Sequence, residues 1–339
     1  MSYDSRLQDV ILEKFWRMSP DQGAVINSNI NKPDIVYHYT SRDACVSVFE
    51  NLIKGRGDSA SGDKCGFAFT DYRFLNDNKE IAIGLKMAKM WLRNSPGDLE
   101  KLVPRILRAL SARAKSKFVP HILSLSLSRD CAVNWMTYTS RKDGGFAIGL
   151  RHDLIEKAVA EFNSKAEINH DKMVLPEEYS RPLIFHPCIY CPQSILEGRL
   201  RGKKYDLFNN AYISLLDQSF AGIGQYLYDR EDDYESCVYW CVERLLQVIC
   251  LVKSDEFRFE NEWRLVLRPE LLKNGVDTKV LGGKARAVPR GLNLSQCITT
   301  LCASPHGDRD RLRLLGDFQM QRLGRKAKTL LSDSSYNGK

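Results

Sequence analysis

The stretch that most constrains the fold is Ile35–Ser41, which has the sequence Ile-Val-Tyr-His-Tyr-Thr-Ser and leads into an amphipathic segment at residues 42–53. Ile, Val and Tyr favour a half-buried strand, while Thr40 and Ser41 are residue types that cap helix N-termini. A strand that passes directly into a helix places its last side chains at a sheet edge beside a helix N-terminus, where ligands often bind. His38 is therefore a candidate binding residue, and the alternative is a core histidine hydrogen-bonded to a neighbour.

The rest of the chain mixes helical and strand patterns. Periodicity predicts strands near residues 65–70, 118–128, 146–150, 182–190, 257–267, 285–288 and 297–303, and helices over 6–18, 80–92, 98–115, 152–162, 205–228, 235–253 and 308–323. This order predicts an α+β fold, with a single domain built on a mixed, split β-sheet wrapped by helices. We expect residues 1–34 to form an N-terminal helix and linker, residues 35–323 the main domain, and residues 324–339 a disordered polar tail.

Composition narrows the setting in which the protein works. Lys and Arg exceed Asp and Glu by 50 to 42, a formal charge of +8 that suits an anionic ligand such as a dinucleotide, with nucleic acid as the alternative partner. The polar first residues and the lack of a long apolar run predict a cytoplasmic protein that does not enter a membrane.

The ten cysteines are expected to be reduced, buried thiols. The pairs Cys188-x2-Cys191 and Cys237-x3-Cys241 have spacings that could also close a zinc site. The first pair lies among β-forming residues and the second on an apolar helix, so we expect no metal.

Several motifs follow the first strand. They are, in chain order, Tyr37-His38-Tyr39-Thr40-Ser41, Asn76-Asp77-x-x-Glu80, Ser124-x-Ser126-x-Ser128, Trp135-x-x-Tyr138, Gly145-Phe146-Ala147-Ile148-Gly149 and Phe259-Glu260-Asn261-Glu262-Trp263-Arg264. The acidic pair in the second has the spacing of a capping box, which explains it without any chemistry. The aromatic pair in the fourth lies one helical turn apart, which is as typical of a core as of a ligand platform.

This series resembles a widespread prokaryotic domain-of-unknown-function family. Its members open with a His-Tyr-Thr-Ser strand, carry an Asn-Asp-x-x-Glu element and close on a Glu-x-Glu-x-Arg strand, and the resemblance covers about residues 35–303. The chain is more distantly similar to the ADP-ribosyltransferase superfamily, where a first-strand His or Arg, a middle aromatic or hydroxyl residue and a late glutamate meet around NAD. His38, either Tyr138 or Ser126, and Glu262 match those positions.

The resemblance implies NAD as the substrate and a role for each matching residue. Glu262 would bind the sugar 2-hydroxyl and offset the positive charge of an oxocarbenium-like transition state, and Glu260 would act as the base for an unknown macromolecular acceptor. The nucleotide-binding set would contain His38 at the adenosine ribose, Thr40 or Ser41 at a phosphate or ribose oxygen, Tyr138 or Trp135 against the nicotinamide, and the neighbouring Tyr39 and Ser126.

Other functions stay open at the level of sequence. Glu260, Glu262 and Arg264 could form a salt-bridge set on one strand face. The leading hypothesis is an NAD-consuming transferase or glycohydrolase of bacterial conflict or phage-defence type. The alternatives are a nucleic-acid-directed defence protein and a non-catalytic nucleotide sensor. The chain has no phosphate-binding P-loop, no Gly-x-Ser-x-Gly elbow and no His-Glu-x-x-His motif.

Overall fold

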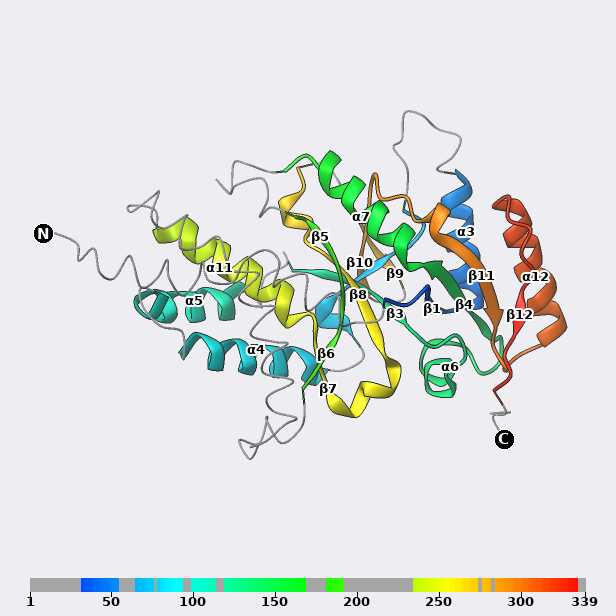
Figure 1. Ribbon diagram of the computed structural model, residues 1–339, viewed down its shortest axis with the longest axis horizontal. Coiled ribbons are helices and arrows are strands. Elements are labelled where there is room, and N and C mark those ends of the chain that lie inside the picture. The colour runs from blue at the N-terminus through cyan, green and yellow to red at the C-terminus, as the bar shows by residue number, and fades with distance from the viewer. Residues whose placement is uncertain are drawn as a thin grey trace, which may run out of the picture.

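The computed structural model describes residues 32–54, 65–75, 78–93, 99–113, 119–168, 181–191, 234–273, 276–281 and 284–334. These residues form an α+β fold with one mixed ten-stranded sheet and interspersed helices (Figure 1). The strands of this sheet are β1 (Ile35–Ser41), β2 (Phe69–Asp71), β3 (His121–Ser126), β4 (Gly145–Arg151), β5 (Leu183–Pro187), β8 (Glu262–Leu267), β9 (Val276–Leu281), β10 (Lys284–Pro289), β11 (Ile298–Ala303) and β12 (Leu330–Leu331). A separate parallel pair consists of β6 (Ile189–Cys191) and β7 (Val252–Ser254).

The main sheet branches at β3. Its path runs β12-β11-β4-β1-β3-β2-β10-β9, and β8 pairs with β3 while β5 pairs with β8. Only β11 and β12 run parallel among its described pairs. Strands β4 and β8 each have strands on both sides, which explains their almost complete burial.

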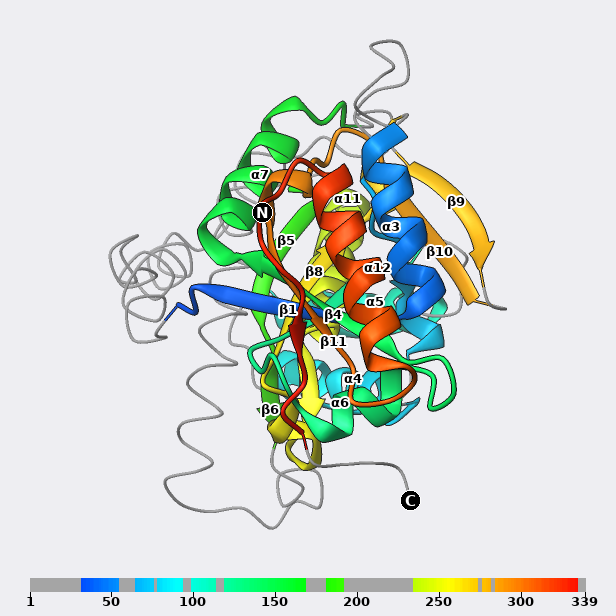
Figure 2. The same ribbon diagram turned by 90° about the vertical axis from the view of Figure 1, so that its right-hand side faces the viewer.

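Helices cover both faces of the sheet. They are α3 (Arg42–Lys54), α4 (Asn78–Arg93), α5 (Leu99–Arg113), α6 (Ala132–Tyr138), α7 (His152–Lys165), α11 (Tyr234–Ile249) and α12 (Arg309–Arg322). In the main core, α3, α7 and α12 pack on one face through Phe49, Ile155 and Leu312. On the opposite face, α6 places Trp135 in a smaller cluster. The helices α4, α5 and α11 group at the other end of the molecule (Figure 1), and Figure 2 shows α3 and α12 side by side.

The junction between β1 and α3 is the one that the sequence predicts. The strand ends at Ser41 and the helix begins at Arg42, with Ser41 Oγ accepting a hydrogen bond from the Ala44 amide at 3.4 Å. The α+β class and the mixed sheet are also as expected.

Two expected segments differ in the structure. The stretch predicted as one strand over 257–267 begins as a 3-10 helix, η4 (Asp255–Glu260), and becomes the strand β8 only after Asn261. Ser254 caps η4 by accepting a hydrogen bond from the Glu256 amide, so local capping overrides the apolar pattern. The segment expected to be a polar tail contains the short strand β12, and Ser332 Oγ donates a hydrogen bond to Asp130. The predicted helices at 6–18 and 205–228 lie outside the described residues.

The sheet opens along one edge of β3. Because β8 pairs with the whole of β3 on one side, β1 and β2 share the other side. There β1 pairs with β3 only at Tyr37 and Ser126, whereas β2 pairs with His121 and Ile122. The middle of β3 therefore has no strand beside it on this edge.

Candidate functional site

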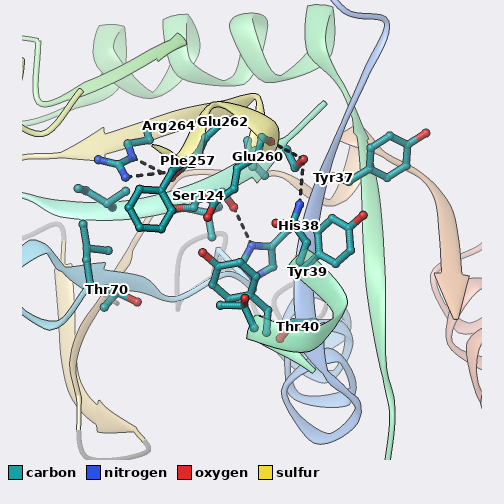
Figure 3. A pocket seen from close by; sticks show the side chains of 18 of the residues that line it. Tyr37, His38, Tyr39, Thr40, Thr70, Ser124, Phe257, Glu260, Glu262 and Arg264 are labelled. Carbon is teal, nitrogen blue, oxygen red and sulfur yellow. Dashed lines mark hydrogen bonds and ion pairs between the residues drawn. The ribbon is translucent and has the colours of Figure 1, made fainter. Parts of the chain in front are cut away.

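A cavity of about 450 Å³ lies at this opening of the sheet. Its lining includes seven of the sequence-predicted site residues, namely His38, Tyr39, Thr40, Ser126, Tyr138, Glu260 and Glu262. They come from β1, β3, α6, η4 and β8, and Figure 3 shows how several of them lie around the cavity. The volume falls within the range of roughly 300–1,000 Å³ that is typical of small-molecule sites.

Asn261 accounts for the placement of the two glutamates. It has a φ of 41°, in the left-handed region that Asn tolerates better than most residues. Glu260 precedes this turn at the end of η4, and Glu262 follows it as the first residue of β8. The turn, rather than the alternation of a continuous strand, brings both carboxylates to one cation.

That cation is Lys253, which is 3% exposed. Its Nζ lies 2.6 Å from Glu260 Oε2, 2.6 Å from Glu262 Oε2 and 3.2 Å from Glu80 Oε1. Arg264 completes the group by donating to Glu262 Oε1 at 2.8 Å and to Glu80 Oε2 at 2.7 Å. Three carboxylates and two cations therefore form one buried cluster on the wall of the cavity, which we call the cavity cluster.

The two predicted catalytic glutamates differ in their surroundings. Both oxygens of Glu262 accept hydrogen bonds from cations. Glu260 accepts one, at Oε2, and its Oε1 has no hydrogen-bond partner among the described residues. Glu260 is therefore the carboxylate with an oxygen left for a ligand.

The pKa values of these carboxylates shift in opposite directions. Burial alone would raise the pKa of Glu262, but Arg264 and Lys253 outweigh it and lower the pKa to about 2. For Glu260, burial dominates over the attraction of Lys253, so its pKa is raised above the ordinary value. Glu262 is thus fixed as an anion, while Glu260 is the better proton acceptor near neutral pH.

His38 lies at the open edge of β3. Its Nδ1 lies 3.0 Å from the Ser124 carbonyl oxygen, so Nδ1 must carry the proton and Nε2 is left as an acceptor (Figure 3). Burial lowers the pKa of His38 to about 4, and the nearby Arg286 charge contributes to this shift. At neutral pH the ring is uncharged and can accept a hydrogen bond from a ligand hydroxyl.

Trp135 differs from its expected role as a ligand platform. It is fully buried, packs edge-on against Tyr39 with ring centroids 4.6 Å apart, and donates its Nε1 proton to Asp130 at 2.6 Å. It does not line the cavity, because α6 turns this residue toward the sheet. Tyr138, one turn later, does line it, and its raised pKa reflects burial together with the charges of Glu262 and Glu260.

Ser126 and Tyr39 line the cavity, but structural contacts occupy their hydroxyls. Ser126 Oγ donates to the Glu260 carbonyl at 2.7 Å and accepts from the Ser128 amide and from Asn134. Tyr39 donates to the Ser128 carbonyl and accepts from the Cys131 amide. The hydroxyls of Ser126 and Tyr39 therefore stabilise the site. Of the two candidates for the middle aromatic or hydroxyl position of the resemblance, Tyr138 is the stronger.

Sequence reasoning missed the roles of Glu80 and Lys253. Glu80 was expected to cap the helix that begins near it, yet its buried carboxylate binds Lys253 and Arg264. Lys253 was placed at the end of a helix, but α11 ends at Ile249 and Lys253 lies in β7. Lys253 follows the apolar run Ile249–Val252 and begins the polar stretch that continues with Ser254 and Asp255, so no local signal distinguishes it from a solvated lysine.

The cavity also has an aromatic and a basic side. Phe257 and Phe259 of η4 line it, and Phe259 is 44% exposed. Lys284 and Arg286 of β10 line it as well. Neither pair belonged to the predicted site: Phe259 stands in the Phe259–Arg264 motif without an assigned role, and no motif contains Phe257, Lys284 or Arg286.

The described residues contain no group of three or more His, Cys, Asp or Glu side chains placed to hold a metal ion. Within the same part of the chain, no helix is long and apolar enough to cross a membrane.

Comparison with known proteins gave no match. No protein-family model, no curated protein and no solved structure matches the chain. The resemblance to the domain-of-unknown-function family and to the ADP-ribosyltransferase superfamily therefore stays a prediction from motifs.

Proposed function

We propose that the cavity binds an NAD-type dinucleotide and that the protein breaks the bond between nicotinamide and ribose, as an ADP-ribosyltransferase-like transferase or glycohydrolase. The observation that carries this proposal is that His38 and Glu260, 222 residues apart in sequence, line the same cavity. A carboxylate beside the reacting sugar serves ribosyl transfer, and a neutral histidine facing the same ligand-sized space can accept a hydrogen bond from a ribose hydroxyl.

The reaction balances without a metal or a redox partner. The C1′–N1 bond breaks, and nicotinamide leaves with the bonding electron pair as a neutral molecule. Water, or an acceptor hydroxyl or carboxylate, attacks C1′ of the oxocarbenium-like ribose and forms the new C–O bond. When the nucleophile is protonated, its proton passes to Glu260 and from there to solvent.

The described contacts support a division of roles. Glu260 offers its unpaired Oε1 to the ribose or to the nucleophile, and its raised pKa suits a base. Glu262 holds Lys253 and Arg264, and so fixes the negative charge beside the developing cation. His38 accepts from a ribose hydroxyl through Nε2, and Tyr138 or Phe257 packs against the departing ring.

The test is nicotinamide release from NAD by the purified protein, with and without cell lysate as a source of acceptors. Glu260→Gln should lower turnover by at least about 100-fold, the low end for a lost general base. Glu256→Gln is the matched control, because Glu256 lies in the same 3-10 helix, is exposed and does not line the cavity. Full activity in Glu260→Gln would remove Glu260 from the mechanism.

A second candidate is a module that binds a nucleotide without turning it over. The observation in its favour is that cations occupy both oxygens of Glu262, the residue that matches the catalytic glutamate of the superfamily. Binding of NAD by folded wild-type protein, with no nicotinamide release in buffer or lysate, would favour this candidate.

A further inference from the structure

We infer that Arg286 forms a phosphate-binding subsite in the cavity, so that the ligand is a nucleotide carrying a diphosphate rather than a nucleoside. This inference deepens the proposed function and rests on it for the adenine nucleotide as the ligand. The subsite itself is argued from the position, burial and missing partner of one guanidinium group.

Arg286 lies on β10, across the open edge of the sheet from β1. It is directly paired with Thr70 of β2, and both residues line the cavity. Lys284, two residues earlier on the same strand, lines it too, as expected for side chains on one strand face. The cavity cluster comes instead from α4, β7, η4 and β8, so Arg286 and Lys284 belong to a different part of the lining from the five paired charges of that cluster.

No described residue forms an ion pair with Arg286, and its Nε is buried without a hydrogen-bond partner. Two other arginines near the sheet have close anionic partners. Arg264 binds Glu80 and Glu262, and Arg290, at the end of the same hairpin, binds Asp277. Keeping a half-buried guanidinium charge without an anion costs stability. Burial accordingly lowers the pKa of Arg286, and a bound anion would offset that cost.

Two neighbours make the same region favourable for an anion. Ser41 and Ala44, at the N-terminus of α3, line the cavity, and the partial positive charge of a helix N-terminus attracts phosphate. His38 is held neutral by its low pKa, so it adds no charge and can bind a ribose hydroxyl next to the phosphate. Arginine is the side chain best suited to grip phosphate oxygens with two parallel hydrogen bonds.

The experiment is calorimetric titration of the full chain with ADP and with adenosine, for wild type, Arg286→Gln and Arg290→Gln. Wild type should bind ADP at least about tenfold more tightly than adenosine, because only ADP reaches the guanidinium. Arg286→Gln should remove this preference and leave adenosine binding unchanged. Arg290→Gln, a charge change on the same hairpin outside the cavity, should bind ADP as wild type does.

Arg286→Lys is a second variant that controls for a folding defect in Arg286→Gln. It keeps the positive charge but loses the forked geometry of the guanidinium. It should bind ADP with an affinity between those of wild type and Arg286→Gln. Equal affinity for ADP and adenosine in wild type, no ADP binding, or unchanged ADP binding in Arg286→Gln would each overturn the subsite. ADP binding that depends on Arg286, without any nicotinamide release from NAD, would keep the subsite and reject the proposed reaction.

Discussion

The protein buries two clusters of opposite charges, and they are satisfied to different degrees. In the cavity cluster, Arg264 donates to Glu262, Glu80 and the Cys250 carbonyl at 2.6–2.8 Å. In the second cluster, Arg268 is fully buried, yet its Nη2 is 3.7 Å from Glu243 and its Nε is 3.4 Å from Glu270. The residues of the second cluster do not line the cavity.

Burial raises the pKa of carboxylates in both clusters, but the net shifts of Glu262 and Glu270 are opposite. Close cations hold the pKa of Glu262 at about 2, against a burial effect that would raise it. Burial, helped by the neighbouring Glu243, raises the pKa of Glu270 to about 8. Burial of charge alone therefore does not mark a functional site. The cavity cluster stands out because it keeps ionised carboxylates at a surface that a ligand can reach.

Removing the central cation should have the largest effect. Lys253→Met leaves the three carboxylates of the cavity cluster with one cation, so the free energy of unfolding should fall by about 3–5 kcal/mol. Lys165→Met is the control, because its pair with Glu161 is exposed and should contribute no more than about 0.5 kcal/mol. Denaturant unfolding measures both. A small loss in Lys253→Met would show that the cluster is not an interdependent unit.

Acid should weaken the cavity cluster. The pKa of Glu262 lies below its ordinary value of 4.5 in the folded state, so its contribution is complete above pH 4.5 and is lost as the pH falls toward 2. As the pH falls, the free energy of unfolding of Glu262→Gln should decrease by on the order of 3 kcal/mol less than that of wild type. Each pKa unit corresponds to about 1.4 kcal/mol. An unchanged acid limb would contradict the ion-paired state of Glu262.

The second cluster should show the opposite trend with pH. The pKa of Glu270 is raised from 4.5 to about 8 in the folded protein, so the folded state holds a proton that the unfolded state releases. Stability from this group is present below pH 4.5 and is lost as the pH rises to about 8. Glu270→Gln, which imitates the protonated acid, should reduce this alkaline loss by on the order of 3 kcal/mol between pH 5 and pH 8, since each pKa unit corresponds to about 1.4 kcal/mol. Thermal unfolding from pH 5 to pH 8 would reveal it.

The smallest effect is expected at the basic side of the cavity. Arg286→Gln removes a half-buried charge that has no ion-pair partner among the described residues, so the unliganded protein should become more stable, by less than about 1 kcal/mol. A clear loss of stability would mean that Arg286 serves the fold rather than a ligand. Melting temperatures measured without nucleotide would separate the two outcomes.

Local sequence patterns were enough for part of this site. The strand-to-helix junction after Ser41 predicted where His38 and Thr40 would lie, because alternation and capping act over a few residues. Glu80 meets Lys253 and Arg264 across more than 170 residues of sequence, and Lys253 meets Glu260 and Glu262 only because the chain turns at Asn261; no local pattern encodes either arrangement.

The turn at Asn261 and the orientation of Trp135 also escaped prediction. Phe257 to Leu267 has the composition of a strand, and only the Ser254 cap signals the 3-10 helix that precedes the turn. Trp135 and Tyr138 share a short helix and a similar chemistry. Which one faces the cavity is decided by the packing of α6 on Tyr39, a tertiary contact.

We propose that one cavity holds a dinucleotide between Glu260 and Arg286. A crystal structure of Glu260→Gln soaked with NAD tests it most directly, because the variant should bind the substrate without consuming it. We predict the nicotinamide ribose within hydrogen-bond distance of the substituted side chain and the diphosphate on the Arg286 guanidinium. NAD bound elsewhere, or a cavity that excludes it at saturating concentration, would contradict the account.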